Sequence, residues 1–324
     1  MNHKRNFIFI LLLILFIIAC TRKTFPGNSG NTDKLRVLGY LASSKNWIYG
    51  INAVDFSKIT DLNLAFINPD STGNFPPNED LRRVVQLAHE NNVRVFASIG
   101  GGNPPSYMAT LMKSDNRTSF ISNIVALADT YNFDGIDVDI ENDLINDQYA
   151  PFVYELAMAV KPKKKLLTAA LASWNGDIVS DTTLQQYDFI NVMSYDKTGP
   201  WDTTRPGQHS PYSMTEGDFN YFHHKRNIPA NKLFLGLPFY GYGFGSGAPS
   251  GLSYKQIIAA YPGSQNNDEV NLPGGGTIYY NGMPTIKDKV LFTKTNKAGG
   301  VMIWQLLGDT TGALSLLNVI NNSK

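Results

Sequence analysis

Apolar segments and amphipathic segments alternate along most of the chain. Eight short apolar runs, each of the length of a buried strand, occupy residues 35–41, 62–67, 93–99, 133–140, 166–172, 189–195, 233–239 and 300–305. Between most of them, apolar residues recur at helical spacing, as in residues 81–90, 120–131, 149–160 and 218–226. Strands that alternate with helices predict a parallel sheet. Eight such units predict an α/β fold, a closed (β/α)8 TIM barrel.

An open, doubly wound sheet is the main alternative, but no glycine-rich phosphate-binding turn follows the first run. The spacing widens once, because about 60 residues separate Phe239 from Gly300, more than one crossover needs. We therefore expect a small α+β insertion between strands seven and eight, at about residues 241–283. Within it we expect a loop over 241–251, a short helix over 252–261 and a strand over 277–282, followed by the seventh barrel helix over 284–294.

The chemistry of a barrel of this type lies at the C-terminal ends of its strands. The insertion follows the end of strand seven, so it would form one wall of a groove at that end.

Composition adds little to this picture. The chain of 324 residues is 43% hydrophobic and 17% charged, with a net charge of +1, which is typical of a globular protein with an ample core. Proteins that bind nucleic acid usually carry a clear basic excess. The near-neutral balance therefore argues against nucleic acid as a partner.

The first 20 residues predict a signal peptide. Basic residues precede an unbroken apolar run of 13 residues, 7–19, which is too short to span a bilayer comfortably. Cys20 follows directly and is the only cysteine of the chain. Residues 17–20, Ile-Ile-Ala-Cys, resemble a bacterial lipobox, in which Cys20 would carry a lipid; a plain secretory signal with an incidental cysteine is the alternative. The polar residues 21–33 predict a flexible tether.

That lipobox implies an exported protein anchored by its lipid to the cell envelope, at the outer membrane or the cell surface. The membrane would then be one of its partners. Residues 34–324 would form the barrel domain.

The stretch 133–141 carries the clearest chemical signal. Aliphatic residues alternate with acids, so a strand would place Asp137, Asp139 and Glu141 on one face. In a strand covered by helices on its outer side, that face points into the barrel. Three carboxyl groups this close cannot all ionise cheaply, so at least one pKa should rise and leave a proton to donate near neutral pH. A solvated acidic edge and a divalent cation site are the alternatives.

Four motifs resemble those of one enzyme family. Residues 134–141 match DGxDxDxE, the active-site signature of family 18 glycoside hydrolases, and residues 98–101, Ser-Ile-Gly-Gly, resemble their SxGG motif on strand three. Residues 193–196, Met-Ser-Tyr-Asp, resemble the MxYD motif of strand six, and residues 299–304 resemble the strand-eight segment that ends in a tryptophan. Residues 199–202 and 209–211 are similar to the loop after strand six in chitinases. Because the motifs occur in order on the expected strands, the chain is identified as a chitinase-like member of this family.

The resemblance implies a retaining glycosidase in which the acetamido group of the substrate is the nucleophile, an exception to the usual pair of protein carboxylates. Glu141 would be the general acid and then the base that activates water. Asp139 would orient the acetamido N–H, and Asp137 would modulate the charge of Asp139. Tyr195 would donate its hydroxyl to the acetamido carbonyl.

The resemblance also implies substrate contacts. Asp196 would hold another polar group of the same sugar, and Trp304 would offer a flat apolar face to the ring. Weaker expectations for the groove are Met193, Tyr40, Phe66 and Trp201, then Trp47, Trp174, Tyr240 and Tyr242, although an aromatic residue at the end of an apolar run is often core. Ser98, Gly100 and Gly101 are expected to support the acids, and His209, His223 and His224 to be surface or loop residues. No cofactor and no metal are expected.

Two departures from the chitinase pattern bear on the groove. Chitinases typically place a tryptophan before the catalytic glutamate and an aromatic–proline pair after it, whereas Ile140 precedes Glu141 here and Asn142 and Asp143 follow. Ile140 should point outward to the helices, so we expect the chemistry to survive. The insertion is also shorter than the α+β domain of processive chitinases, which predicts an open cleft suited to endo-type cutting or to short oligosaccharides.

Three functions stay open at this point. The first is hydrolysis of chitin or chito-oligosaccharides, with an N-acetylglucosamine-containing oligo- or polysaccharide as substrate. The second is an endo-β-N-acetylglucosaminidase that acts on the chitobiose core of N-glycans. The third is a non-catalytic chitin-oligosaccharide-binding protein, which the presence of an acid at position 141 disfavours.

Overall fold

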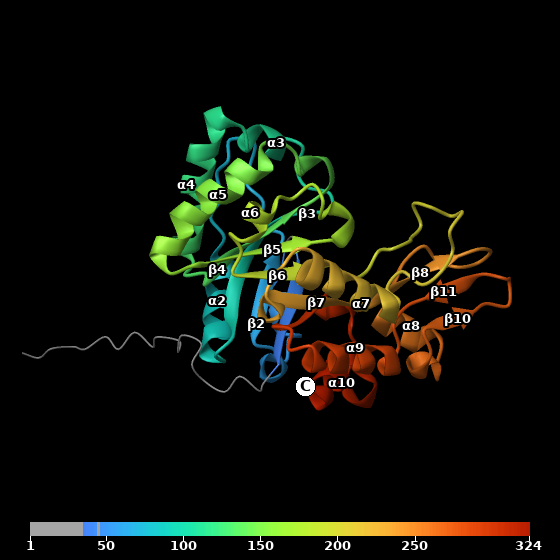
Figure 1. The fold of residues 1–324 in the computed structure, drawn as a ribbon. Helices are drawn as coiled ribbons and strands as arrows, with labels where there is room; N and C mark the ends of the chain where they lie inside the picture. Colours follow the sequence, from blue (N-terminus) through green and yellow to red (C-terminus); the bar gives the residue numbers. More distant parts are fainter. Residues whose placement is uncertain (1–34, 44–45) are drawn as a thin grey trace, which may run out of the picture. The chain divides into compact units, whose positions relative to one another are not determined.

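The computed structural model describes residues 35–43 and 46–324 of the chain (Figure 1). They form one compact unit, Leu35–Lys324. The predicted signal peptide, Cys20 and the tether lie outside the described residues. No helix in the described part is both long and apolar enough to cross a membrane.

Eight parallel strands close into a barrel, which confirms the predicted (β/α)8 fold. They are β1 (Arg36–Ala42), β2 (Asp61–Ala65), β3 (Arg94–Gly101), β4 (Gly135–Ile140), β5 (Leu166–Leu171), β6 (Phe189–Val192), β7 (Leu233–Pro238) and β12 (Gly300–Trp304). Their order around the barrel follows the chain, and β12 pairs with β1 to close it. Each predicted apolar run overlaps one of these strands.

Helices surround the barrel in the order that the pattern predicts. The longer ones are α2 (Glu79–Glu90), α4 (Ser114–Thr130), α5 (Tyr149–Val160), α7 (Tyr212–Asn220), α9 (Met283–Thr295) and α10 (Leu316–Ser323), and α1 (Trp47–Ile51), α3 (Met108–Leu111) and α6 (Asp181–Leu184) are short. Figure 1 shows α4 beside α5, and α9 beside α10, as their contacts require. The stretch predicted as helical over 218–226 is helical as far as Lys225, but the helix starts earlier than expected. It begins directly after Pro211, whose fixed φ suits a helix start, and it continues beyond Asn220 as a π-helix, Tyr221–Lys225.

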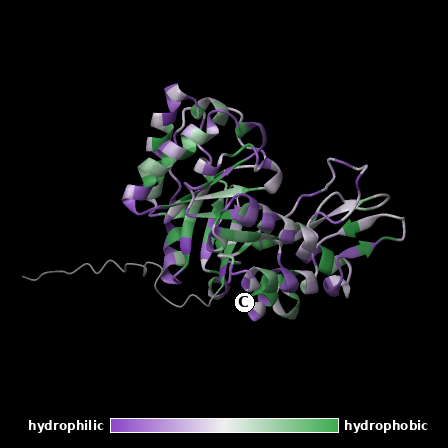
Figure 2. Cartoon of the chain, in the orientation of Figure 1, coloured by the Kyte–Doolittle hydropathy of each residue, from purple (hydrophilic) through white to green (hydrophobic). Residues whose placement is uncertain are grey.

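The barrel strands are largely apolar (Figure 2), and their buried side chains form an outer and an inner cluster. Ile136, Val138 and Ile140 of β4 pack in the outer cluster, between strands and helices. The lumen is filled by a separate cluster that includes Phe96, Phe189, Phe234 and Met302. This alternation confirms the predicted faces of β4, because the intervening acids must then point into the lumen.

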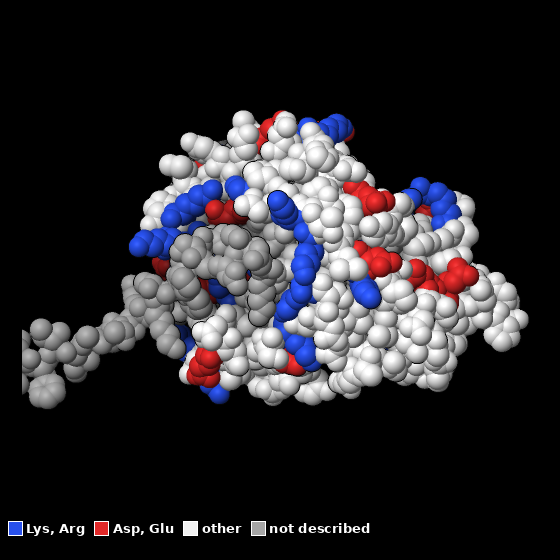
Figure 3. Space-filling model, turned by 60° about the horizontal axis from the view of Figure 1, so that its bottom comes forward, with Lys and Arg blue, Asp and Glu red and all other residues white. Residues whose placement is uncertain are grey.

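Basic residues gather at the N-terminal end of the barrel. Lys161 and Lys163 lie in the short helix η3 (Lys161–Lys163), just before β5 begins. Figure 3 shows Lys and Arg side chains gathered on the face that is brought forward from the bottom of Figure 1. At this end the buried Asp61 pairs with Arg36 at 2.8 Å and with Arg94 at 2.9 Å. These basic residues therefore lie at the opposite end of the barrel from the acids of β4.

The insertion between strands seven and eight is confirmed as a small α+β unit. It contains β8 (Tyr240–Phe244), β9 (Leu252–Ser253), α8 (Tyr254–Ala260), β10 (Glu269–Asn271) and β11 (Thr277–Tyr279), with the sheet order β10-β11-β8-β9. The prediction of a loop over 241–251 is wrong for its first residues, which belong to β8 (Tyr240–Phe244). Gly241 and Gly243 indicated a loop, but they allow close packing: a Cβ atom on Gly241 would lie 2.7 Å from Cβ of Tyr280.

Candidate active site

The three acids of β4 reach the C-terminal end of the barrel in steps. Asp137 is 0% exposed and Asp139 is 3% exposed. Glu141 follows the last residue of β4 and is half-buried. The pairing of β3 with β4 places Ser98 beside Asp137 and Gly100 beside Asp139. The depth of each acid is therefore set by its position along one strand.

Asp137 is fully hydrogen-bonded by the protein. Its Oδ2 atom accepts from the hydroxyls of Tyr40 at 2.7 Å and Ser98 at 2.8 Å. Its Oδ1 atom accepts from Thr168 at 2.6 Å and from the amide of Asn191 at 3.0 Å. Burial raises the pKa of Asp137, while the four donors oppose that rise. Asp137 is thus fixed in one orientation, and Ser98 supports it as expected.

Asp139 is held quite differently. It shares a hydrogen bond with Glu141, and its Oδ1 atom is buried without a hydrogen-bond partner in the part of the chain that the structure describes. Burial, then the charges of Glu141 and Asp137, raise the pKa of Asp139 well above its usual range. Burial also raises the pKa of Glu141, although the hydrogen bond from Asp139 opposes this. The pair therefore binds a proton more tightly than two isolated carboxyl groups would, and this proton can pass between its members.

Tyr195 presents a hydroxyl beside this pair. Its side chain is 5% exposed, and the hydroxyl contacts the sulfur of Met302 at 3.6 Å. Burial and the nearby carboxylate of Asp139 raise the pKa of Tyr195 well above its usual range. The hydroxyl stays protonated and, among the described residues, has only this weak acceptor, so it is able to donate to a ligand. Met193 is 8% exposed and packs in the same lumen cluster.

Asp196 forms a polar wall with residues of the insertion and of the loop after β6. It accepts a hydrogen bond from Tyr240 at 2.6 Å, and Nδ1 of His209 lies 3.5 Å from it. The His209 ring packs against the rings of Tyr240 and Tyr242, with centroid distances of 4.9 Å and 5.0 Å. His209 was expected to be a surface or loop residue; it lies in the loop after β6, but it is 0% exposed and therefore not at the surface. The loop after β6 folds back and inserts this ring behind Asp196.

Aromatic rings form the floor beside the carboxylates. Trp304 is half-buried, stacks on Phe66 at a centroid distance of 5.6 Å and meets the edge of Tyr40 at 5.4 Å. Tyr40 is only 1% exposed, so it does not line a groove as expected. Its ring lies against Trp304 and its hydroxyl holds Asp137. Trp47 is 4% exposed and belongs to the outer core.

Two tryptophans are exposed near these residues. Trp201 is 61% exposed and meets the edge of Tyr242 at 5.4 Å. Trp174, which follows β5, is 53% exposed and lines a cavity of about 640 Å³ together with Asp196. Neither Asp139 nor Glu141 lines this cavity, so the cavity lies beside the carboxyl pair and not over it.

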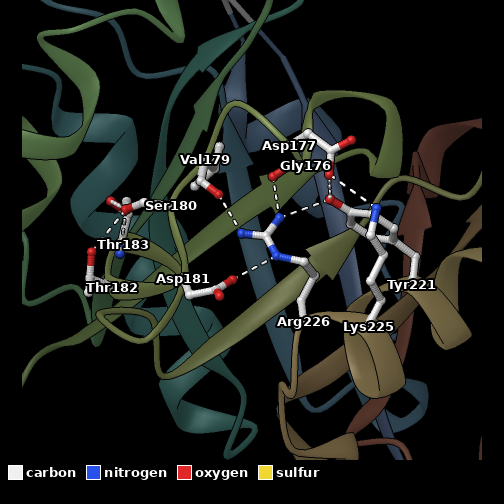
Figure 4. Close-up of polar contacts among 10 residues, drawn as sticks. All are labelled: Gly176, Asp177, Val179, Ser180, Asp181, Thr182, Thr183, Tyr221, Lys225 and Arg226. Carbon is white, nitrogen blue, oxygen red and sulfur yellow. Dashed lines mark hydrogen bonds and ion pairs between the residues drawn. The ribbon is translucent and has the colours of Figure 1, made fainter.

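The segment after Trp174 is anchored by one guanidinium group (Figure 4). Arg226 donates to the carboxylate of Asp181 at 2.7 Å, to the carbonyl of Val179 at 2.6 Å and to the carbonyl of Gly176. It also donates to the hydroxyl of Tyr221 at 2.8 Å. The loop that carries Trp174 is therefore fixed to the helix after β6.

The structure does not arrange the acids of β4 as a cation site. Both oxygens of Asp137 are occupied by protein donors. Across residues 35–43 and 46–324, no group of three or more His, Cys, Asp and Glu side chains is placed to hold a metal ion.

The comparisons with known proteins agree on one family. Residues 36–309 match the family model described as glycosyl hydrolases family 18. Endochitinase 1 of Metarhizium anisopliae is 26% identical over 279 residues, which cover 71% of this chain and 65% of that protein. Chitinase-3-like protein 2 of Homo sapiens is 25% identical over 276 residues, 68% of this chain and 70% of that protein.

Solved structures match more of the chain. The GH18 chitinase ChiB from the chitin utilization locus of Flavobacterium johnsoniae is 37% identical, with a TM-score of 0.82, over 90% of this chain and 94% of that one. A chitinase from Bacteroides thetaiotaomicron is 29% identical, with a TM-score of 0.79, over 89% of this chain and 96% of that one.

Proposed function

The chain belongs to glycosyl hydrolase family 18, and on that premise we propose that it is a retaining glycosidase that cleaves β-1,4-linked N-acetylglucosamine glycans, chitin or chito-oligosaccharides. One observation carries the proposal. Asp139 and Glu141 form a hydrogen-bonded pair at the C-terminal end of the barrel, above an Asp137 that four donors hold in place. The names of the relatives, which include two bacterial chitinases of known structure, support the substrate class.

Glu141 is the proton donor in this proposal. Its raised pKa keeps it protonated at a pH where an exposed glutamate is ionised, and its half-buried position leaves it accessible to a leaving oxygen. As the bond between the anomeric carbon and that oxygen breaks, the proton moves from Glu141 to the oxygen. The hydrogen bond from Asp139 then stabilises the glutamate anion that remains.

The acetamido carbonyl of the substrate supplies the electron pair that forms the new bond to the anomeric carbon. The buried, unpartnered Oδ1 atom of Asp139 is an acceptor for the acetamido N–H. The hydroxyl of Tyr195, which has only a sulfur partner, donates to the acetamido carbonyl. Asp196 binds a further polar group of the sugar and Trp304 supports its ring, which orients the internal nucleophile. Glu141 finally takes a proton from the water that opens the cyclic intermediate.

Side-by-side assays test the substrate class. The purified protein is incubated with soluble chito-oligosaccharides and with a high-mannose glycoprotein, and the products are identified by mass. We expect short N-acetylglucosamine oligomers from the first substrate. Release of a whole glycan from the second would identify an endo-β-N-acetylglucosaminidase instead, and binding of chitin oligomers without any turnover would identify a non-catalytic binding protein.

We also propose that the protein is exported and lipid-anchored to the cell envelope through Cys20, with residues 34–324 as its catalytic domain. The apolar run 7–19 followed at once by a lone cysteine supports this proposal. Mass analysis of the mature amino terminus tests it. A chain that begins with a diacylglycerol-modified Cys20 is expected, and a mature chain cleaved elsewhere and free of lipid would contradict it.

A further inference from the structure

Lys289 of α9 is a buried cation that the chemistry above does not use. Its side chain is 0% exposed, although lysine is rarely buried completely. Its ammonium group donates to the carbonyl of Ser210 at 2.8 Å, to the hydroxyl of Ser210 at 2.7 Å and to the side-chain oxygen of Asn281 at 2.8 Å. Burial lowers the pKa of Lys289 to about 7, and the charges of Asp268 and Asp218 only partly oppose this.

These hydrogen bonds connect three segments of the chain. Asn281 lies at the end of the insertion, just before α9, and its amide also donates to the carbonyl of Ser210 at 2.9 Å. The hydroxyl of Ser210 donates in turn to the carbonyl of Ser194 at 2.6 Å. Ser194 directly precedes Tyr195 at the end of β6. Lys289 therefore fixes Ser210 at the point where the loop after β6, the insertion and the barrel meet.

Ser210 directly follows His209, whose ring packs against Tyr240 and Tyr242 with Nδ1 3.5 Å from Asp196. A shift of Ser210 would move this ring and with it the wall behind Asp196. A buried ammonium group is costly even when hydrogen-bonded, and an apolar residue of similar volume would hold α9 at a lower cost. What the ammonium group provides, and an apolar residue would not, is a set of hydrogen bonds that fixes the position of the loop after β6.

We propose that Lys289 is a positioning residue, which fixes Ser210 and thereby places His209 and Asp196 at the wall of the groove. The structural part of this inference stands independently, and its kinetic part rests on the proposed glycosidase activity. Lys289 itself touches no substrate.

The test compares Lys289→Met with Lys287→Met in the full chain. Methionine keeps the length of the side chain but removes every donor, and Lys287 is exposed on the same helix. The first readout is the NMR spectrum of histidine-labelled protein, in which the rings of Tyr240 and Tyr242 shift the His209 signals. We expect these signals to move in Lys289→Met and to stay unchanged in Lys287→Met.

The second readout is kinetics on chito-oligosaccharides, at a temperature where circular dichroism shows both variants folded. Small displacements of positioning groups cost an enzyme up to about a hundredfold in rate, so we expect kcat/KM of Lys289→Met to fall by about tenfold to a hundredfold. Most of the loss should appear in KM, because Asp196 binds sugar. A merely structural lysine would lower the melting temperature and leave KM unchanged.

If Lys289→Met does not fold, Ser210→Ala replaces it, because this change removes only the hydroxyl that links Lys289 to Ser194. The same changes are then expected at a smaller size. A folded variant with wild-type His209 signals, or with moved signals and an unchanged kcat/KM, overturns the inference. Failure of the proposed function would show as an inactive wild-type protein, which leaves the NMR result able to decide whether Lys289 positions His209.

Discussion

The two sides of the candidate groove are built in different ways. On one side, β4 and the residue directly after it supply Asp137, Asp139 and Glu141 within five residues of sequence. On the other side, Asp196 is held by Tyr240 of β8 and approached by His209 from the loop after β6. The first side depends on the geometry of a single strand, whereas the second depends on contacts between distant segments. The spacing of the acids is fixed by the geometry of one strand. The wall around Asp196, by contrast, forms only when segments that are distant in the sequence come together in the folded chain.

The two sides also differ in what their groups are ready to do. Around β4, burial raises the pKa of Asp139 and of Glu141, so these carboxyl groups bind a proton more tightly than exposed ones do. At the wall, hydroxyl and ring contacts fix the direction of Asp196. We therefore expect changes on β4 to affect the chemical step and changes at the wall to affect substrate binding. Each prediction below can break or sharpen that division.

The largest effect is expected from Glu141→Gln. The amide keeps the shape of the side chain but cannot supply an acidic proton, so kcat should fall by about 10²–10⁴-fold. Binding of chito-oligosaccharides, measured by calorimetry, should change little. Loss of binding with turnover retained would place the chemistry elsewhere and remove the distinction between the two sides.

Asp139→Asn tests how much the burial of the Asp139 carboxyl group destabilises the folded protein. A carboxyl whose folded pKa is raised binds its proton more tightly in the folded state, so its contribution to stability falls as pH rises from its unfolded pKa to its folded pKa. At neutral pH the amide should therefore raise the free energy of unfolding, by about 1 kcal/mol or more. Denaturation at pH 7 measures this, and the gain should shrink at a pH below the ordinary aspartate pKa.

A gain that is equal at both values of pH would show that the charge of Asp139 is not the cause. Turnover of Asp139→Asn should fall at the same time, because an amide cannot carry the negative charge that would offset the positive charge of the cyclic intermediate. Higher stability with lower activity is the pattern expected of a functional group held in a costly environment.

Tyr240→Phe tests the wall. It removes the hydroxyl that donates to Asp196, and one hydrogen bond to a charged group contributes about 1.5–3 kcal/mol at most, so we expect kcat/KM to fall by about tenfold, mainly through KM. Tyr280→Phe is the matched control, because its hydroxyl donates to the carbonyl of Ser264 inside the insertion. A change in kcat alone, or an equal effect of the control, would contradict the role assigned to the wall.

The smallest effect is expected from Arg226→Gln. This change frees the segment after Trp174, so KM for long chito-oligosaccharides should rise about twofold to fivefold while short ones are unaffected. Lys225→Gln is the control, because the exposed pair of Lys225 with Asp177 at 3.3 Å contributes little. An equal rise of KM for short and long substrates would place the effect on the catalytic groups and not on the cavity beside them.

The same division explains what could be predicted from the sequence. The barrel follows from eight apolar runs with helical stretches between them, and the faces of β4 follow from a strict alternation of aliphatic and acidic residues. Both signals are local, so no knowledge of distant contacts is needed. The supporting donors Thr168 and Asn191 were not predicted, although a lone polar residue on the inner face of an apolar strand is a signal that could have found them.

The wall was harder to predict because its residues acquire their roles only through contacts. His209 lies in a polar loop, and nothing near it in the sequence indicates that its ring is buried against two tyrosines. Gly241 and Gly243 in β8 suggested a loop, but in the structure their lack of a side chain lets neighbouring residues pack closely against the strand. Tyr40 was expected at the groove because it ends an apolar run, whereas the register of β1 places it under Trp304.

The most direct test of the central claim is the sequence of the products from partially deacetylated chitosan. If the acetamido group of the substrate is the nucleophile, cleavage requires this group on the sugar at the cleaved bond. Mass sequencing should therefore find N-acetylglucosamine at every new reducing end, even where free glucosamine is abundant in the polymer. A substantial fraction of new reducing ends that carry glucosamine would show that the protein supplies the nucleophile, and this would contradict the account.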